Sequence, residues 1–402
     1  MPRLFALNFR TGLLIGFAVA IAVAAGAIAL ERYDTQTLKR TVRRDAVLCG
    51  VNTGLPGFSS ADEKGNWSGF DVDFCRAIAA AIFDDPSKVK FVPLDASESF
   101  TELQQRKVDV LSRNTTWNLS REANYALNFA AVSYYDGQGF MVPKSRNAES
   151  ALELDAAKIC VQSNTTTELN LADYFRANNM KYREMKFAKM DDVFKAYDGG
   201  QCDVLTTDAS RLYALRLKLS RPNDHVILPD VISKEPLAPV VRHKDDDWFL
   251  VVKWTFYAMV NAEELGITSQ NIDEALKSTK PDVISKEPLA PVVRHKDDDW
   301  FLIVKWTFYA MVNAEELGIT SQNIDEALKS TKPDVMRFVG TEGTYGEELG
   351  LTKDWAVRII RHVGNYGEVY ERNVGVDSDL GIPRGLNELW NAGGILYAPP
   401  IR

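Results

Sequence analysis

The feature that most constrains this chain is an alternation of short apolar strands with amphipathic helices, which runs twice along the sequence. The first run predicts strands at 46–51, 89–94 and 108–111 and helices at 69–83 and 97–106. The second run predicts strands at 158–161, 182–187, 203–205 and 225–228 and helices at 165–176, 190–197 and 209–217. Such alternation builds sheets of parallel strands covered by helices on both faces. We therefore predict an α/β fold of two similar lobes around a cleft, with extended crossing segments at 138–143 and 237–241.

A tandem repeat interrupts this pattern. Residues 229–280 recur at once as 281–332 with a single difference, Val251 against Ile303. Near-identity indicates either a recent duplication or an assembly error in the sequence. Each copy carries one crossing strand and one amphipathic helix, and a two-lobed body needs only one such element. Each large apolar side chain left in water forgoes about 1.5–3 kcal/mol. We expect one docked copy and one extruded copy.

The N-terminus has the features of an export signal. Arg3 and Arg10 precede an uncharged run at 11–30 that is rich in Ala, Gly and Val, and small residues at 25–27 and 27–29 suit signal peptidase. We favour a cleavable signal peptide at 1–29 and a periplasmic protein. The run is long enough for an uncleaved anchor, so a membrane-tethered sensor domain is the alternative.

Export would place the four cysteines in an oxidising compartment, where disulfides persist. Three pairings are possible, and sequence order suggests Cys49 with Cys75 and Cys160 with Cys202; four buried thiols are the alternative. The sequence has no C-x-x-C and its four histidines are scattered, so we expect no metal and no cofactor. The net charge of −8 argues against a nucleic-acid partner.

One loop has the composition of an anion site. The stretch 109–121 reads D-V-L-S-R-N-T-T-W-N-L-S-R, so Thr116 and Arg121 lie five residues apart after a strand-like start. A hydroxyl and a planar guanidinium that converge from one loop can hold a carboxylate. A surface arginine after an edge strand is the simpler alternative.

Several longer strings carry a family resemblance. They are G-F-D-V-D-F from Gly69, R-N-T-T-W-N-L-S-R, D-G-Q-G-F-M-V-P, T-T-T-E-L-N-L-A-D-Y-F, I-S-K-E-P-L and V-G-N-Y-G-E-V-Y-E-R-N. The chain resembles the polar amino acid family of periplasmic solute-binding proteins, the receptors of ABC importers. The resemblance implies a type II periplasmic binding protein fold with a hinge of two crossing strands. It also implies an L-amino acid ligand of broad class, permease subunits in the inner membrane as partners, and a monomeric receptor.

The resemblance divides the chain into segments with separate roles. They are a signal peptide (1–29), the first part of lobe 1 (38–137), lobe 2 (138–236), a return to lobe 1 (237–280), the tandem copy (281–332) and a C-terminal extension on lobe 1 (333–402).

The same resemblance implies ligand contacts from both lobes. Lobe 1 would bind the α-carboxylate through Arg121 and Thr116, with Asn114 nearby, and lobe 2 would add the helix start at Gln162, Thr165 and Thr166. The family usually has Gly where Asn164 stands, and Asn tolerates the positive φ that this position needs. Asp208 matches the acceptor for the α-ammonium and could also cap the helix after it. Asn52 and Phe58 match the loop at the side-chain end of the pocket.

No nucleophile, general base or metal set is assembled in the sequence, so we expect no enzymatic activity. Some proteins of this fold are exported dehydratases, which would need a cleft acid in place of part of this clamp.

Overall fold

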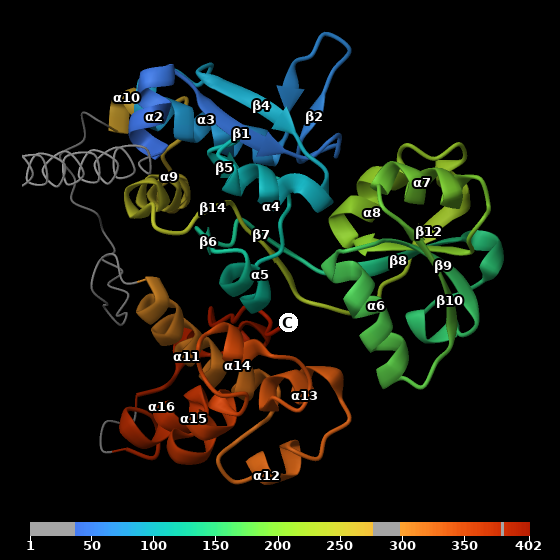
Figure 1. Ribbon diagram of the computed structural model, residues 1–402, viewed down its shortest axis with the longest axis vertical. Helices are drawn as coiled ribbons and strands as arrows, with labels where there is room; N and C mark the ends of the chain where they lie inside the picture. Colours follow the sequence, from blue (N-terminus) through green and yellow to red (C-terminus); the bar gives the residue numbers. More distant parts are fainter. Residues whose placement is uncertain (1–36, 276–297, 379–381) are drawn as a thin grey trace, which may run out of the picture.

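The computed structural model describes residues 37–275, 298–378 and 382–402, arranged as two sheet-containing lobes and a helical body (Figure 1). The expected signal peptide at 1–29 lies outside the described residues, as does the start of the tandem copy at 281–297. Within the described ranges, no helix is both long enough and apolar enough to span a membrane.

The first lobe contains a five-stranded sheet in the order β4-β1-β5-β14-β6. Its strands are β1 (Val47–Val51), β4 (Val89–Pro93), β5 (Val110–Leu111), β6 (Leu127–Phe129) and β14 (Val240–Arg242), and its helices are α2 (Thr37–Arg44), α3 (Phe70–Phe83), α4 (Ala96–Gln104) and α5 (Leu119–Asn124). The three predicted strands β4, β1 and β5 run parallel, and β14 joins them antiparallel from the returning chain. Helix α3 buries Phe74 and Ile78 of its predicted apolar face in the same core as Val47 and Val51, whereas Phe70 at the start of that face is exposed.

The second lobe repeats this plan in a sheet of order β10-β9-β11-β8-β12. Its strands are β8 (Gln138–Pro143), β9 (Ala157–Gln162), β10 (Tyr182–Phe187), β11 (Val204–Asp208) and β12 (His225–Ile227), and its helices are α6 (Thr166–Ala177), α7 (Met190–Asp198) and α8 (Ala209–Arg216). The predicted alternation is confirmed, and the carboxyl ends of β9 and β11 lead into α6 and α8. Such strand ends face the crevice in which ligands bind in open α/β sheets.

The segments that cross between the lobes are β7 (Tyr134–Asp136) and β13 (Glu235–Leu237), which pair antiparallel. The prediction that 138–143 is a crossing segment was wrong. That run is β8, which pairs with β11 and β12 inside the second sheet and is buried from Gln138 to Val142. Its continuous apolar run belongs to a strand covered on both faces. A small hairpin, β2 (Ser60–Ala61) with β3 (Trp67–Ser68), extends from the first lobe.

Both repeat copies form a 19-residue helix, α9 (Asp246–Glu264) and α11 (Asp298–Glu316). Helix α9 belongs to the first lobe, where Trp248 is fully buried and its Nε1 donates to the Asp109 carbonyl at 2.9 Å. Helix α11 packs instead in the helical body, which consists of α12 (Ile324–Ala327), α13 (Pro333–Val339), α14 (Tyr345–Glu348), α15 (Trp355–Val363) and α16 (Tyr366–Asn373). For the helices that the structure describes, the expectation of one docked and one extruded copy was wrong, because the first lobe buries Trp248 of α9 and the C-terminal helices cover the apolar face of α11. The later part of α9 stays exposed at Trp254 and Met259.

The two helices, which differ only at Val251 against Ile303, bury different faces. Trp248 of α9 is 0% exposed whereas its counterpart Trp300 in α11 is 53% exposed. The reverse holds for Trp254 at 57% and Trp306 at 0%. The first lobe thus packs against one face of the repeat helix, and the C-terminal helices pack against another face. A single copy of the helix has both faces.

The C-terminal body contacts both lobes. Leu119 of α5 joins its apolar cluster, and Arg176 of α6 forms an ion pair with Glu342 at 3.1 Å. The last residues run along the start of α5, where the Ser120 amide donates to the Arg402 carbonyl at 3.2 Å. The C-terminal residue is thereby placed beside the interlobe cleft.

Each lobe contains one disulfide. Cys49 pairs with Cys75 between β1 and α3, and Cys160 pairs with Cys202 between β9 and the approach to β11, with Cα separations of 6.2 and 5.9 Å. The predicted pairing is confirmed.

Candidate ligand-binding site

A cavity of about 710 Å³ lies between the two lobes. Its lining includes seven of the residues that the sequence proposed for the ligand: Asn114, Thr116, Arg121, Gln162, Thr165, Thr166 and Asp208. The first three come from the loop after β5 and from α5, and the others come from the ends of β9 and β11 and the start of α6. The fold thus brings both halves of the predicted clamp to one space.

Arg121 is held from two sides. Its Nη1 donates to the Thr116 carbonyl at 2.8 Å, and its guanidinium lies 5.6 Å from the centre of the Phe100 ring. Burial lowers the pKa of Arg121, and the carboxylates of Glu235 and Asp208 oppose that shift. A guanidinium positioned before a ligand arrives loses little conformational freedom when it binds an anion.

The start of α6 has the geometry of an anion site. Asn164 adopts φ of 59°, as the Gly-to-Asn substitution predicted, and Thr165 is the N-cap. The Thr165 hydroxyl accepts from the Glu168 amide at 3.4 Å. The side chain of Gln162 donates to the Ala188 carbonyl at 3.0 Å, which fixes it at the end of β9. The first amides of a helix and its dipole favour a negative charge here.

Asp208 stands at the N-cap position of α8 but its side chain does not cap that helix. The carboxylate of Asp136 accepts from the Ser210 amide at 3.3 Å instead, which leaves Asp208 directed at the cleft, where Asn114 Nδ2 donates to it at 3.3 Å. Burial, followed by the nearby Glu235 carboxylate, raises the pKa of Asp208 to about 7. Its charge state therefore changes near neutral pH.

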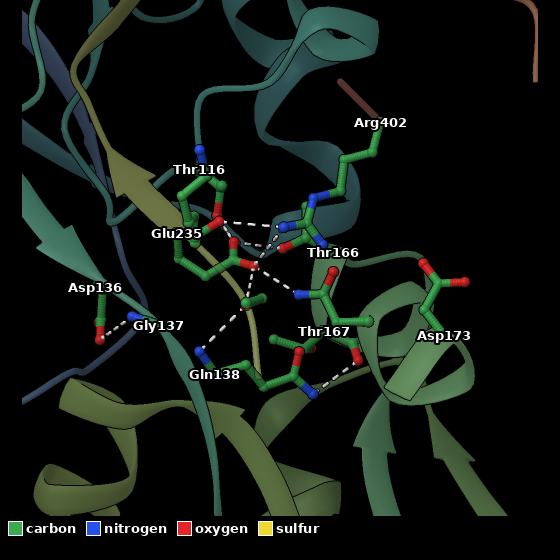
Figure 2. Close-up of polar contacts among 12 residues, drawn as sticks. Thr116, Asp136, Gly137, Gln138, Thr166, Thr167, Asp173, Glu235 and Arg402 are labelled. Atoms are coloured by element: carbon green, nitrogen blue, oxygen red, sulfur yellow. Dashed lines mark hydrogen bonds and ion pairs between the residues drawn. The ribbon is translucent and has the colours of Figure 1, made fainter. Parts of the chain in front are cut away.

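Glu235 is a buried residue beside the cleft that the sequence analysis missed. Its buried carboxylate accepts hydrogen bonds from the side chains of Thr116, Thr166, Asn170 and Ser233, so residues of both lobes meet on one hinge-strand acid (Figure 2). The guanidinium of Arg402 lies 4.0 Å from it. The string I-S-K-E-P-L marked this segment as characteristic of the family, but nothing in it located the carboxylate beside the cleft.

Three further arginines line the cavity: Arg113, Arg211 and Arg402. The sequence analysis did not select them, and only the folded arrangement brings them together. Burial lowers the pKa of Arg113 to about 10, with the positive charge of Arg211 as the next cause.

Asn52 and Phe58 do not belong to the lining of this cavity. Asn52 lies behind it, where its Nδ2 donates to Asn114 Oδ1 at 2.9 Å. Phe58 packs with Leu55, Ala214 and Leu237 in an apolar cluster. The first loop therefore packs behind the cavity. Burial of Phe58 among apolar side chains is more favourable than its exposure to a polar cleft.

Comparison with known proteins identifies the family. The model of the bacterial extracellular solute-binding proteins, family 3, matches residues 47–323. The chain belongs to this family. The predicted family and the two-lobed fold are thereby confirmed.

Family 3 relatives match nearly the whole chain. The general L-amino acid-binding periplasmic protein AapJ of Rhizobium johnstonii is 49% identical over 385 residues, 95% of this chain and 98% of the relative. The glutamate/glutamine/aspartate/asparagine-binding protein BztA of Rhodobacter capsulatus is 43% identical over 381 residues, with shares of 95% and 98%. A solved structure of an ABC transporter periplasmic binding protein from Brucella ovis, with glutathione bound, has a TM-score of 0.55 and 48% identity, covering 91% of this chain and 99% of that one.

Proposed function

We propose that this protein is a periplasmic receptor that captures L-amino acids of several kinds and delivers them to an ABC importer. The observation that carries the proposal is the single cavity that gathers Arg121 and Thr116 from one lobe with Thr166 and Asp208 from the other. Two relatives support it, since AapJ is named as a general L-amino acid-binding protein and BztA as a glutamate/glutamine/aspartate/asparagine-binding protein.

The proposed contacts follow from charge. Arg121 and the first amides of α6 would bind the α-carboxylate, and Asp208 would accept from the α-ammonium, with Asn114, Gln162 and Thr165 alongside. The hydroxyls of Thr116 and Thr166 already donate to Glu235. Since a hydroxyl has one proton to donate, a ligand carboxylate must take these donors from Glu235. Ligand entry would thus loosen one interlobe network and form another.

Delivery would depend on lobe closure. Because both lobes contribute contacts, a bound ligand favours the closed arrangement by its differential affinity for it. We propose that the closed, monomeric receptor is recognised by permease subunits of the inner membrane. Export by a cleaved signal peptide at 1–29 and a transport rather than enzymatic role complete the proposal.

A thermal-shift screen tests this function. Protein unfolded and refolded to remove bound ligand is heated with each of the common L-amino acids, and several of them should raise the melting temperature. Arg121→Ala should abolish these shifts while the ligand-free protein stays folded. Arg221→Ala, at a side chain 80% exposed, is the matched control. Equal shifts in the melting temperatures of wild type and Arg121→Ala would show that Arg121 does not contact the ligand.

A further inference from the structure

Two buried arginines, one from each lobe, line the interlobe cavity. Arg113 follows β5 in the first lobe and is 7% exposed, and Arg211 lies in the first turn of α8 in the second lobe and is 8% exposed. Both belong to the cavity lining. Among the described residues, neither Nε has a hydrogen-bond acceptor. Carboxylates act on them at longer range: Asp71 and Asp95 on Arg113, and Asp208, Asp136 and Asp71 on Arg211.

This arrangement is costly unless something else occupies the cavity. A buried charge is normally paired and hydrogen-bonded, because desolvation otherwise costs more than the protein gains. Here two cations also repel each other, since each guanidinium carries a fixed positive charge. A structural role would be expected to bring a carboxylate into hydrogen-bond contact with each. Asp71 is available nearby, yet one of its oxygens, Oδ1, accepts from Ser112 and the other is unpaired.

The other charged groups of the lining are already engaged. Arg402 donates to the Lys234 carbonyl at 3.2 Å and lies 4.0 Å from Glu235. Glu168 pairs with Lys186 at 2.6 Å. In the proposed function, Arg121 takes the α-carboxylate and Asp208 takes the α-ammonium. Arg113 and Arg211 are then left as an unmatched pair of positive charges within the same cavity.

We propose that Arg113 and Arg211 form a second anion subsite, which binds the side-chain carboxylate of an acidic L-amino acid such as L-glutamate. The inference rests on the proposed function, because the α-groups must be held elsewhere in the cavity. One arginine comes from each lobe, so a side-chain carboxylate between them screens their repulsion and connects the lobes. Planar guanidinium groups suit this role because each can donate two parallel hydrogen bonds to a carboxylate.

L-Glutamate and L-glutamine provide the test, since they have nearly the same shape and differ in side-chain charge. Their dissociation constants are measured by titration calorimetry on ligand-stripped protein. Arg211→Gln should weaken L-glutamate binding by tenfold or more and change L-glutamine binding less than about threefold, since a charged hydrogen bond contributes about 1.5–3 kcal/mol. Arg211→Lys should recover part of the loss. Arg216→Gln, on the same helix, is the control and should change neither.

Arg113→Gln provides a second, independent variant from the other lobe, and circular dichroism checks its fold. Equal losses for L-glutamate and L-glutamine in both folded variants would overturn the subsite, because the arginines would then bind the α-carboxylate or only support the cleft. Unchanged L-glutamate affinity in both would overturn it too. Failure of wild-type protein to bind either ligand would instead contradict the proposed function.

Discussion

The hydroxyl of Thr166 donates to the carboxylate of Glu235 at 3.0 Å, so the first turn of α6 is tied to the hinge strand β13. Thr116, on the opposite lobe, donates to the same carboxylate oxygen, Oε2. The hinge acid therefore holds the two lobes against each other at the ligand cavity.

Replacing Glu235 by Ala should lower the free energy of unfolding by about 2–3 kcal/mol, because buried donors of Thr116, Thr166 and Asn170 lose their acceptor. Urea unfolding followed by circular dichroism measures this. Glu149→Gln, at an exposed position of the second lobe, should leave stability unchanged. A Glu235→Ala protein as stable as wild type would show that water replaces the carboxylate without cost.

Ligand affinity should rise with pH up to about 7 and then level off. The pKa of Asp208 is raised to about 7 by burial and Glu235, so at lower pH the carboxyl is protonated and cannot accept an ammonium as an anion. At pH 6 the affinity should be roughly tenfold below the plateau. Titration calorimetry between pH 5.5 and pH 8 checks this dependence.

The ligand-free stability should show the opposite trend. In the unfolded chain Asp208 ionises near the ordinary pKa of 3.8, whereas in the folded protein it stays protonated to about pH 7. The contribution of Asp208 to the free energy of folding is therefore full at low pH and is lost as pH rises through 7. Asp208→Asn should remove this contribution.

Glu235→Gln should move the midpoint of ligand binding to lower pH, because it removes a negative charge that raises the pKa of Asp208; an unmoved midpoint would assign the shift to burial alone.

Each disulfide should stabilise its own lobe. Sequence separations of 26 and 42 residues correspond, by the entropy of the closed loop, to about 3.5 kcal/mol for Cys49–Cys75 and about 4 kcal/mol for Cys160–Cys202. Paired Cys→Ala variants, compared by denaturant unfolding, should show losses of this order. A loss below about 1 kcal/mol in either lobe would mean that the unfolded chain is not constrained by that bond.

Deletion of 281–332 should give a folded receptor that binds ligand as wild type does. Trp254 of α9 is exposed while its counterpart Trp306 is buried by the C-terminal helices, so one copy of the helix offers a face to each partner. In the shortened protein, Trp254 should become inaccessible to acrylamide quenching. Loss of binding in a folded deletion variant would make the second copy part of the receptor's structure.

The sequence predicted what local pattern determines. Strand and helix periodicity predicted most strands of both sheets and the helix that Thr165 caps, and sequence order predicted the cysteine pairs, because each depends on residues close in sequence or within one lobe. The prediction for the first crossing strand was wrong. The true crossing strand, Tyr134–Asp136, is too short to show an alternation, so the longer apolar run at Gln138–Pro143 resembles a crossing strand more closely.

Groups brought together only by the fold could not be predicted. Arg211 and Arg402 reach the cavity from the first turn of α8 and from the last residue, with no shared motif. Glu235 lies beside the cavity on the hinge strand β13. The two repeat helices, which differ only at Val251 against Ile303, show the limit most directly: nearly the same sequence buries Trp248 in the first lobe and Trp306 in the C-terminal body. Which face is buried depends on the partner and not on the sequence of the helix.

The central claim, an L-amino acid held by Arg121 and Asp208, is tested most directly by titration calorimetry of ligand-stripped protein with L-glutamine and with D-glutamine. Saturable heat at one site per molecule is predicted for the L-enantiomer, with binding of the D-enantiomer at least tenfold weaker, because the carboxylate and ammonium contacts fix the configuration at Cα. Absence of heat with L-glutamine and with every other L-amino acid, or equal binding of the two enantiomers, would contradict the account.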